Sequence, residues 1–554
     1  MNVAQYVLAR LREVGATHVF TVPGDYCKDF ISALDADAHV ERIATVNELG
    51  AGYAADGYGR VKGVGALCVQ YGVGSFSALN CVAGSFVERV PVVLISASPT
   101  KANRQQELRQ NVLFHHSTGD LRVDQEVFRH VTVASLVLDD AGAAPDLVDR
   151  AFVAMLQHSR PIYIEALQDI WAASCRLPNG PLVVPPAESD PAALKTMLDA
   201  AWPLLQSARA PVIWGGVEIG RFGLTGPLQD LVRRSGMPFT TTSLGKTILD
   251  EGQRQFIGTY AGPASPESTW NYLNAADCIL ALGTIVTDDY LNIVNTSYDK
   301  MIMVTDEEAR IGYARYANVT MRDFIAGLLQ RFEAGGRHEW PMPPAPPPFP
   351  IPAPDARLTY NSFAAELTEW MRAEKLFGSS HLILGESTSL YVLGNVFGMP
   401  ANSFVANAAW GSLGHETGAA LGTMLGSGKR AFVVAGDGGF RMICQELSSL
   451  EQARQNAIVF VMSNNAYAIE QAFVSLDAFK PGGSFAAFDL LPEWDYCSLA
   501  QAFGAVGRRV TTAGELREAL KAAQNIKDCP MLVEVVIDQK DLAPQLYRLA
   551  ATPP

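Results

Sequence analysis

Short apolar runs, often rich in β-branched residues, recur along the chain, and each is followed by a stretch with apolar positions at helical spacing. Runs that are apolar throughout, rather than alternating with polar residues, are typical of strands covered on both faces in a parallel sheet. This alternation of strand and helix patterns predicts an α/β fold. In the first third of the chain the predicted strands are residues 17–22, 43–46, 66–70 and 91–96.

The same pattern returns in the last and the middle thirds. In the last third the predicted strands are residues 382–384, 431–435, 457–462 and 531–537. In the middle third they are residues 211–214, 239–242, 278–282 and 301–304. The middle third carries no comparable cluster of polar residues, so we expect it to have a structural or regulatory role.

Two proline-rich segments, 176–191 and 338–354, interrupt these patterns. Such segments sustain neither a helix nor a central strand, so they predict linkers. A chain of 554 residues is also too long for a single hydrophobic core. We therefore predict three α/β domains, each with a central, mainly parallel sheet, at residues 1–175, 192–335 and 355–554.

The first and last domains also share a short sequence similarity. Residues 48–55 and 414–420 both begin a helical pattern with many small side chains, which allow close packing. Common ancestry of the two domains and independent selection for packing both explain this similarity.

Charge and cysteine content narrow the classes of function. The net charge is −14, and no dense run of Lys and Arg is present, which argues against a nucleic-acid partner. The eight cysteines are dispersed and form no C-x-x-C pair, as expected for buried thiols in a reducing compartment. No segment approaches the length of a membrane span, and the N-terminus lacks a signal-type apolar core. We expect a cytoplasmic protein with a small-molecule substrate.

A glycine-rich turn joins the predicted strand 431–435 to the next helical pattern. Such a turn offers backbone N–H groups to a phosphate. A dinucleotide-binding motif is disfavoured, because G-x-G-x-x-G requires glycine where Arg441 stands. The carboxylate within the turn is instead suited to a hard cation that bridges a diphosphate. The turn consists of Gly436, Asp437, Gly438 and Gly439.

The next predicted strand ends at a second polar segment, in which Asn464 follows Asp437 by 27 residues. This interval spans one helix and one strand, so the two strand ends emerge at the same edge of a parallel sheet. We expect the Asp437 carboxylate, the Asn464 amide oxygen and the Ala466 carbonyl to ligate Mg²⁺. Paired asparagines alone more often mark a turn. Together with the Gly-Asp-Gly turn at this interval, they are a specific signal for such a metal site.

These two segments resemble the signature of thiamine-diphosphate enzymes. Residues 463–470 are similar, without gaps, to the segment N-N-x-G-Y-T-x-E of pyruvate and indolepyruvate decarboxylases. Ser463 and Ala466 depart from that pattern, but neither departure removes a side-chain ligand, because the match aligns Asn464 with the ligating asparagine. Four further segments look like the same family: residues 22–26, 47–49, 114–119 and 409–414.

The paired histidines in residues 114–119 are the discriminating feature. Members of the superfamily that oxidise or condense 2-oxo acids usually lack them. The resemblance therefore implies a thiamine-diphosphate- and Mg²⁺-dependent decarboxylase that converts a 2-oxo acid, pyruvate or a larger aromatic or branched one, to an aldehyde and CO₂. It also implies that the first domain binds the pyrimidine ring and the last domain the diphosphate and Mg²⁺.

The resemblance assigns roles to individual residues. Glu48 would hydrogen-bond the pyrimidine ring, although an acid that favours a helix N-terminus is the alternative. Asp25, His115, His116 and Glu470 would handle the substrate carboxylate and transfer protons. Adjacent histidines are otherwise usually solvated loop residues.

Further positions match cofactor and pocket contacts of the family. Leu413 would hold the cofactor bent, with a plain core leucine as the alternative, and Ser389 would bind the diphosphate, with an ordinary helix cap as the alternative. Core filling is the alternative for Tyr391 and Phe473. The additional implied cofactor contacts are Gly411 and Ile469, and the implied pocket residues are Tyr290, Tyr391, Ile469 and Phe473.

Two other functions compete with this interpretation: a thiamine-diphosphate carboligase of the acetohydroxyacid synthase type, and a non-catalytic relative. The histidine pair and Glu470 argue against the carboligase, and the same residues together with Glu48 and Asp25 argue against the non-catalytic relative. The family also implies active sites between subunits, and therefore a homodimer or homotetramer. The preferred 2-oxo acid is not determined by these motifs.

Overall fold

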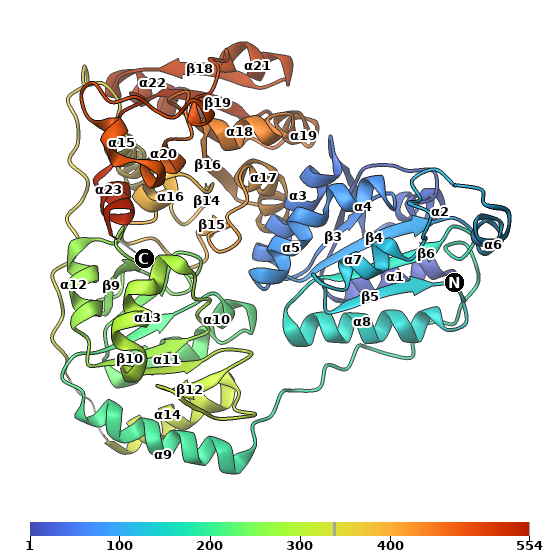
Figure 1. Ribbon diagram of the computed structural model, residues 1–554, viewed down its shortest axis with the longest axis horizontal. Helices are drawn as coiled ribbons and strands as arrows, with labels where there is room; N and C mark the ends of the chain where they lie inside the picture. The colour runs from blue at the N-terminus through green and yellow to red at the C-terminus, as the bar shows by residue number, and fades with distance from the viewer. Residues whose placement is uncertain (336–338, 553–554) are drawn as a thin grey trace.

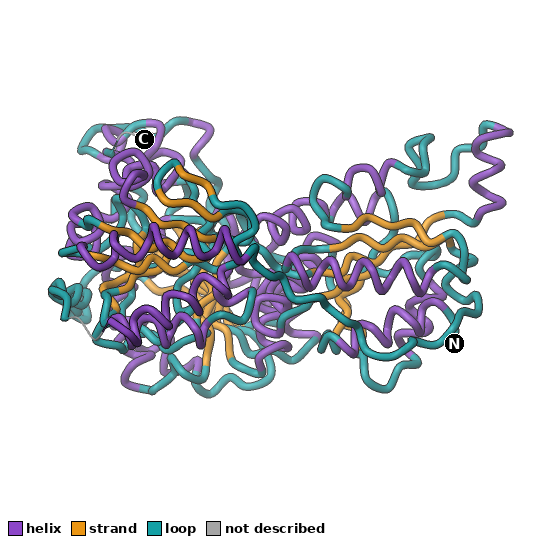
Figure 2. The backbone as a smooth tube through the Cα atoms, turned by 90° about the horizontal axis from the view of Figure 1, so that it is seen from below, coloured by secondary structure: helices purple, strands orange, loops and turns teal. Residues whose placement is uncertain are grey.

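Three β-sheets, each flanked by helices, follow one another along the chain (Figure 1). The computed structural model describes residues 1–335 and 339–552, so His338, the first residue of the second predicted linker, lies outside the described residues. Figure 2 shows the strands as inner layers with helices outside them. In the described part of the chain, no helix combines the length and the apolar character needed to cross a bilayer.

The first sheet has six parallel strands in the order β2-β1-β3-β4-β6-β5. Four of its strands were predicted, with ends that differ by one or two residues, and β5 and β6 were missed. Its strands are β1 (His18–Thr21), β2 (Glu41–Ala44), β3 (Gly65–Cys68), β4 (Val92–Ser98), β5 (Ala134–Leu138) and β6 (Ile162–Leu167). Its helices are α1 (Val3–Glu13), α2 (Lys28–Asp35), α3 (Glu48–Lys62), α4 (Val73–Ser77), α5 (Leu79–Val87), α6 (Lys101–Gln110), α7 (Val123–Phe128) and α8 (Ala144–His158).

The last sheet also has six parallel strands, in the order β15-β14-β16-β17-β19-β18. This order is that of the first sheet, strand for strand. Its strands are β14 (Ser380–Leu384), β15 (Phe404–Ala406), β16 (Arg430–Gly436), β17 (Ile458–Ser463), β18 (Val506–Val510) and β19 (Met531–Val536). Its helices are α15 (Tyr360–Ala373), α16 (Thr388–Leu393), α17 (His415–Ser427), α18 (Asp437–Ile443), α19 (Glu446–Gln452), α20 (Ala468–Val474), η3 (Leu476–Phe479), η4 (Ala487–Asp489), α21 (Tyr496–Ala502), α22 (Ala513–Ala523) and α23 (Pro544–Ala551).

The middle sheet has seven strands in the order β13-β12-β11-β10-β7-β8-β9, and β12 and β13 run antiparallel to their neighbours. The predicted fold, three mainly parallel sheets in an α/β protein, is confirmed. Its strands are β7 (Pro211–Gly215), β8 (Phe239–Thr242), β9 (Phe256–Tyr260), β10 (Cys278–Leu282), β11 (Met301–Val304), β12 (Ala309–Ile311) and β13 (Ala314–Arg315). Its helices are α9 (Pro191–Ser207), α10 (Glu218–Arg221), α11 (Thr225–Ser235), α12 (Glu267–Ala275), η1 (Asp288–Tyr290), α13 (Leu291–Ser297), η2 (Tyr298–Lys300) and α14 (Met321–Gly335).

The segments between the sheets agree with the proline pattern. Residues 176–190 and 339–354 contain neither helix nor strand. Helix α9 begins at Pro191, because proline is well accommodated in the first turn of a helix, and Asp190 caps that turn. The domain boundaries themselves remain predictions.

Helices α3 and α17 pack directly against each other and join the first sheet to the last (Figure 1). A Cβ at Gly57 would collide with the backbone of Ala419, and one at Gly422 with the backbone of Ala54. The small side chains noted in the sequence are therefore required by a close helix crossing. Both helices follow the edge strand of their sheet, β2 or β15, so they occupy equivalent places in two sheets of the same topology.

A buried ion network crosses this helix pair. The Arg60 guanidinium lies 2.6 Å from a carboxylate oxygen of Asp56 and 2.6 Å from one of Glu88. His415 Nε2 of α17 lies 2.6 Å from Asp56 Oδ2. Burial opposes the charge of Asp56, but Arg60 and His415 hold the pKa of this carboxyl well below its ordinary value. The network thus connects the first and last domains, because Asp56 of α3 contacts both Arg60 of the same helix and His415 of α17.

An Arg60→Met variant should lose about 3–5 kcal/mol of stability, because Asp56 and Glu88 would remain buried without their shared cation. Chemical denaturation followed by fluorescence measures this loss. Arg233→Met is the matched control, since Arg233 is exposed and pairs with Asp230 at the surface. Equal destabilisation by the two substitutions would contradict the role given to the network.

Candidate active site

The glycine-rich turn lies at the carboxyl end of β16, and Asp437 begins α18. The Asp437 side chain is buried. Its Oδ2 accepts hydrogen bonds from the backbone N–H groups of Asn464 (3.2 Å) and Asn465 (2.7 Å), and its Oδ1 accepts one from Gly438 (3.0 Å). Strands β16 and β17 are parallel neighbours, so the two polar segments meet at one sheet edge, as the spacing predicted. Burial raises the pKa of Asp437 to about 6.

Three oxygens of this edge are suited to a hard cation. Asn464 Nδ2 donates to Tyr360 Oη at 3.3 Å, and Asn464 Oδ1 accepts from the Ala466 N–H at 3.1 Å and retains a second lone pair. Within the described residues, the Ala466 carbonyl accepts no hydrogen bond. No cluster of three or more His, Cys, Asp or Glu residues in that part of the chain offers a rival metal site. One carboxylate, one amide oxygen and one carbonyl fit Mg²⁺ that keeps further phosphate and water oxygens.

The diphosphate side of the site contains a hydroxyl without a protein partner. Ser387 caps α16 by accepting the Ser389 N–H at 3.2 Å, so Ser389 is not the cap. Ser389 Oγ is buried and has no hydrogen-bond partner among the described residues. Gly436 lies beside Ser387, since a Cβ on the glycine would be 3.4 Å from the serine Cβ. A buried hydroxyl next to the glycine-rich turn fits a phosphate-bearing cofactor, because an unpaired hydroxyl is otherwise unfavourable.

The loop that contains Gly411 and Leu413 lies against the same turn. A Cβ on Gly439 would be 3.9 Å from the Leu413 Cβ, and Leu413 is half-buried. Gly411 has a φ of 66°, a value that favours glycine. The hydroxyl of Ser412 is anchored to Tyr53, with 2.6 Å between the two oxygens. Leu413 is thus held beside the turn, where its predicted contact with a cofactor is sterically feasible.

The predicted residues of the first domain gather at the carboxyl ends of its strands. Asp25 Oδ1 accepts a hydrogen bond from Gln70 Nε2 at 2.9 Å. The ring of Tyr71 packs edge-on against the His116 ring, with 5.9 Å between centroids, and the Tyr71 hydroxyl donates to the His115 carbonyl. Both histidine side chains are exposed. Asp25 and the histidine pair therefore form one cluster held by aromatic and amide contacts.

Glu48 is the first residue of α3, and it lies near this cluster. The helix is capped by Asn47, whose side chain accepts the Gly50 N–H at 2.7 Å. A Cβ on Gly74 would be 3.3 Å from both Glu48 Oε1 and the Gln70 Cβ, so glycine leaves room for the carboxylate. Within the described residues the Glu48 carboxylate has no hydrogen-bond or ion-pair partner. It is half-buried and available to a ligand.

In this single chain the two groups of residues form separate half-sites. Among the described residues, no hydrogen bond, ion pair or ring contact joins Asp25 or the histidine pair to Asp437 or Glu470. Helices α2 and α6 of the first half-site lie at the far end of their sheet from α18 and α20 (Figure 1). Large apolar side chains near the half-sites are exposed, which is typical of a surface that binds another chain. They include Val73 (56%), Leu113 (67%) and Phe473 (56%).

Carboxyl groups missed by the sequence analysis surround the predicted pocket residue Tyr391. Its hydroxyl lies 3.5 Å from Glu386 Oε1 and 3.4 Å from Asp289 Oδ1. Burial and the neighbouring Asp289 raise the pKa of Glu386 to about 8, and burial raises that of Asp289 to about 6. Asp289 belongs to the middle domain, which thus contributes a polar group here. The signal for Glu386 was its place two residues after the predicted strand 382–384, in the segment that contains Ser389.

The remaining predicted residues are distributed between core and surface. Tyr290 is buried in the core of the middle domain, where its hydroxyl accepts the Ser243 N–H at 3.0 Å and its ring packs on Trp214. Its neighbour Asp289, rather than Tyr290, reaches Tyr391. Ile469 is partly buried against the last core, and Glu470 is exposed on α20.

The raised pKa of Glu386 predicts a pH-dependent stability. Between about pH 5 and 8 the folded protein holds a proton on this carboxyl that the unfolded chain releases, so its contribution declines as pH rises. In cofactor-free protein, a Glu386→Gln variant should therefore become progressively more stable relative to the parent over this interval. Thermal denaturation at several pH values measures the difference.

The control for this measurement is Glu369→Gln, because Glu369 is exposed at the surface of α15. It should change the denaturation midpoint equally at every pH. The carboxyls and the hydroxyl that face Glu386 are those of Asp289, Tyr391, Glu88 and Glu470, and all remain in the variant. A pH-independent difference between Glu386→Gln and the parent would contradict the prediction.

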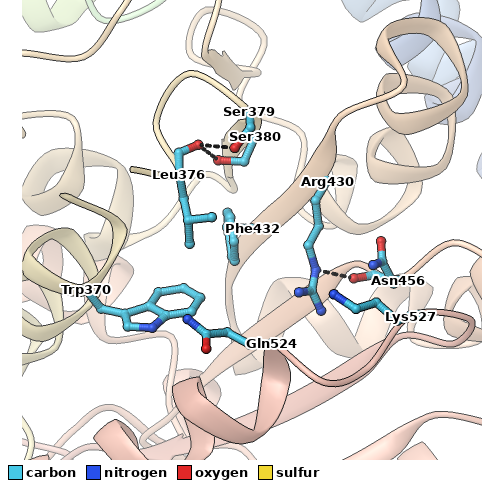
Figure 3. A pocket seen from close by; sticks show the side chains of 9 residues that line it. All are labelled: Trp370, Leu376, Ser379, Ser380, Arg430, Phe432, Asn456, Gln524 and Lys527. Carbon is cyan, nitrogen blue, oxygen red and sulfur yellow. Dashed lines mark hydrogen bonds between the residues drawn. The ribbon is translucent and has the colours of Figure 1, made fainter. Parts of the chain in front are cut away.

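A separate hollow of about 300 Å³ lies at the opposite edge of the last sheet (Figure 3). Ser380 and Arg430, which line it, are the first residues of β14 and β16. Arg430 Nε donates to the Asn456 carbonyl at 2.7 Å. Ligands of open α/β sheets bind at the carboxyl ends of the strands, so this hollow is not part of the candidate site.

The fold and the two half-sites define the class of protein, and comparison with known families agrees. Residues 1–119 match the family described as "Thiamine pyrophosphate enzyme, N-terminal TPP binding domain". Residues 198–332 match its central domain, and residues 389–535 match its C-terminal TPP binding domain. The predicted cofactor, thiamine diphosphate, is thereby confirmed.

Relatives that align with almost the full length of the chain indicate which kind of thiamine-diphosphate enzyme it is. The chain is 31% identical to "Alpha-keto-acid decarboxylase" of Mycobacterium leprae (strain TN), over 99% of this chain and 95% of that protein. It is 28% identical to "Pyruvate decarboxylase" of Neurospora crassa, over 98% of this chain and 95% of the relative. It is 29% identical to "Pyruvate decarboxylase" of Aspergillus fumigatus, over 100% of this chain and 96% of that protein. The chain belongs to the thiamine-diphosphate-dependent 2-oxo acid decarboxylase family, as its motifs indicated.

Proposed function

We propose that this enzyme converts a 2-oxo acid to an aldehyde and CO₂ in an active site assembled from the first domain of one copy and the last domain of another. The observation that carries this proposal is the presence, in one chain, of two complementary half-sites at the carboxyl ends of equivalent sheets. One has free Glu48 beside Asp25 and the histidine pair. The other has the oxygen set around Asp437.

The last domain would hold the cofactor. Asp437, Asn464 and the Ala466 carbonyl would ligate Mg²⁺, and the buried Ser389 hydroxyl would donate to the diphosphate. The glycines of the turn would let the phosphates approach the backbone closely, and Leu413 would support the rings. When bound, thiamine diphosphate supplies a nucleophilic carbon and an electron sink for the bond to CO₂.

The other residues would bind the substrate and move protons. Glu48 would hydrogen-bond the pyrimidine ring and hold a proton at that nitrogen. Asp25, His115 and His116 would orient the substrate carboxylate and exchange protons with the product carbon. Glu470, with Tyr391 and Phe473, would close the opposite side and exclude water. These roles divide the work between two domains, so neither half-site suffices alone.

Product analysis tests this proposal. Purified enzyme with thiamine diphosphate, Mg²⁺ and pyruvate, a branched-chain 2-oxo acid, phenylpyruvate or indolepyruvate should yield CO₂ and free aldehyde in equal amounts. The kcat/KM values for these four acids would identify the preferred substrate. Acyloin as the dominant product would contradict the proposal in favour of a carboligase.

A homodimer or homotetramer follows from the proposal, and mixing two variants tests it. Glu48→Gln and Asp437→Ala inactivate different half-sites. In a mixed dimer, one site carries both defects and the other carries neither. Co-expressed chains should therefore regain activity that neither variant has alone, and the absence of recovery in isolated mixed dimers would contradict shared sites.

We also propose a cytoplasmic location without a nucleic-acid or membrane partner. All eight cysteines are free, as expected in a reducing compartment. The strongly negative net charge disfavours nucleic acids.

A further inference from the structure

A hollow of about 730 Å³ lies where the three domains meet. Its walls come from the end of α3, from α10 and the loop after β8, and from the beginnings of β14 and β16. Lys429 immediately precedes β16, and His381 is the second residue of β14. The hollow therefore lies at the amino ends of strands of the first and last sheets, whereas both half-sites lie at the carboxyl ends of the strands in these two sheets.

Six of the side chains that line the hollow are basic, and none of the described lining residues is Asp or Glu. This is unexpected for a chain with a net charge of −14. The basic residues in the lining are Arg60, Lys62, Arg221, Lys246, His381 and Lys429.

Three of these cations lack a carboxylate partner. Arg60 is neutralised by its buried network, and Lys246 lies 2.8 Å from Glu251. Within the described residues, the Arg221 guanidinium donates only to backbone carbonyls, at 3.3 Å and 3.5 Å, and burial lowers its pKa to about 10. Lys62 and Lys429 form no ion pair within the described residues. Cationic side chains from all three domains thus line one hollow; the carboxylates of Asp56 and Glu88 lie near Arg221, whereas Lys62 and Lys429 have no such partner among the described residues.

His381 gives an independent indication of a ligand. Its side chain is 3% exposed, and neither ring nitrogen has a hydrogen-bond partner among the described residues. Burial and the nearby Lys429 lower its pKa to about 4, so the imidazole is neutral and offers one donor and one acceptor. A buried ring with two unsatisfied nitrogens is unfavourable unless a polar molecule contacts it.

We propose that this hollow binds an organic phosphate, whose phosphate group contacts Arg221, Lys62, Lys429 and the neutral His381. Arginine and lysine are the usual phosphate ligands of proteins. The volume is that of a small-molecule site and far exceeds one phosphate ion. Apolar side chains such as Val64, Val217 and Phe404 line the rest and suit an organic body.

Such a ligand would bridge the domains and give Lys62 and Lys429 an anionic partner. It would stabilise the folded protein by mass action. Because the hollow lies away from the half-sites, the ligand would bind the cofactor-loaded enzyme without displacing thiamine diphosphate. This inference is independent of the proposed catalytic roles.

Calorimetric titration of the holoenzyme tests the proposal. The enzyme is first saturated with thiamine diphosphate and Mg²⁺, so that the diphosphate site is filled. The probes are adenosine monophosphate, glucose 6-phosphate, orthophosphate and succinate, a dianion without phosphate. We expect one organic phosphate to bind once per chain and at least tenfold more tightly than orthophosphate or succinate. The first two probes distinguish a nucleotide from a sugar phosphate.

The double variant Arg221→Met, Lys429→Gln should weaken this binding at least tenfold. Lys62→Gln changes only an exposed residue at the rim, so it keeps the test valid if the double variant folds poorly, and it should weaken binding too. Arg233→Gln combined with Lys521→Gln removes two exposed charges elsewhere and should leave binding unchanged. Failure of both organic phosphates to bind, equal binding of succinate, or binding insensitive to Lys62→Gln would overturn the proposal.

Discussion

A Glu48→Gln variant should release CO₂ from its 2-oxo acid about 100- to 10,000-fold more slowly than the parent enzyme, the range expected when a positioned proton-transfer group is lost. Glutamine keeps the shape of the side chain but cannot hold a proton as a carboxyl does. Within the described residues Glu48 has no protein partner, and it begins a capped helix, so the substitution should leave the fold intact.

The measurement is the steady-state rate of CO₂ release at saturating cofactor, with circular dichroism as a check of folding. Glu41→Gln is the matched control, because Glu41 lies on β2 a few residues earlier and is exposed. Its rate should be unchanged. Undiminished turnover by Glu48→Gln would refute the role assigned to this carboxylate.

The second large effect is expected from Asp437→Ala, which should weaken Mg²⁺-dependent binding of thiamine diphosphate about 100-fold or more. Loss of residues that only orient metal ligands already costs 10- to 100-fold, and Asp437 is itself the proposed ligand. The carboxylate also accepts three backbone N–H groups, so its removal releases the segment that carries Asn464.

Titration of the cofactor at several Mg²⁺ concentrations measures this effect. Asp477→Ala, which removes an exposed carboxylate on η3, should bind the cofactor as the parent does. If Asp437→Ala retained full affinity, the proposed metal site would be wrong.

Most strands were predictable because their residues are apolar without interruption. Three of the missed strands, β6, β15 and β18, lack this pattern for identifiable reasons. Strand β6 contains Glu165, a buried acid that is tolerated because Arg104 pairs with it and the Tyr163 hydroxyl donates to it at 2.7 Å. Strand β18 exposes Arg508 and Arg509, and β15 has only three residues. Partners that neutralise a buried charge come from distant positions, so a local pattern cannot reveal them.

In the candidate site, too, some features were predictable from local sequence and others depended on contacts between distant residues. The pairing of Asp437 with Asn464 was predictable because one helix and one strand separate them, and parallel topology then brings the strand ends together. Ser389 was ambiguous until Ser387 proved to be the cap. Glu386 and Asp289 meet at Tyr391 from different domains, and no spacing along the chain encodes that contact.

Residue types within short segments of the sequence were sufficient to identify the cofactor anchor, the strand edges and the decarboxylase motifs. Packing within the middle domain was needed to bury Tyr290 in a core. Packing between domains was needed to separate the two half-sites and to gather Lys62, Arg221 and Lys429 around one hollow. The physical reason is that these contacts join residues far apart in the chain. Their geometry depends on how whole domains pack, as at the crossing of α3 and α17.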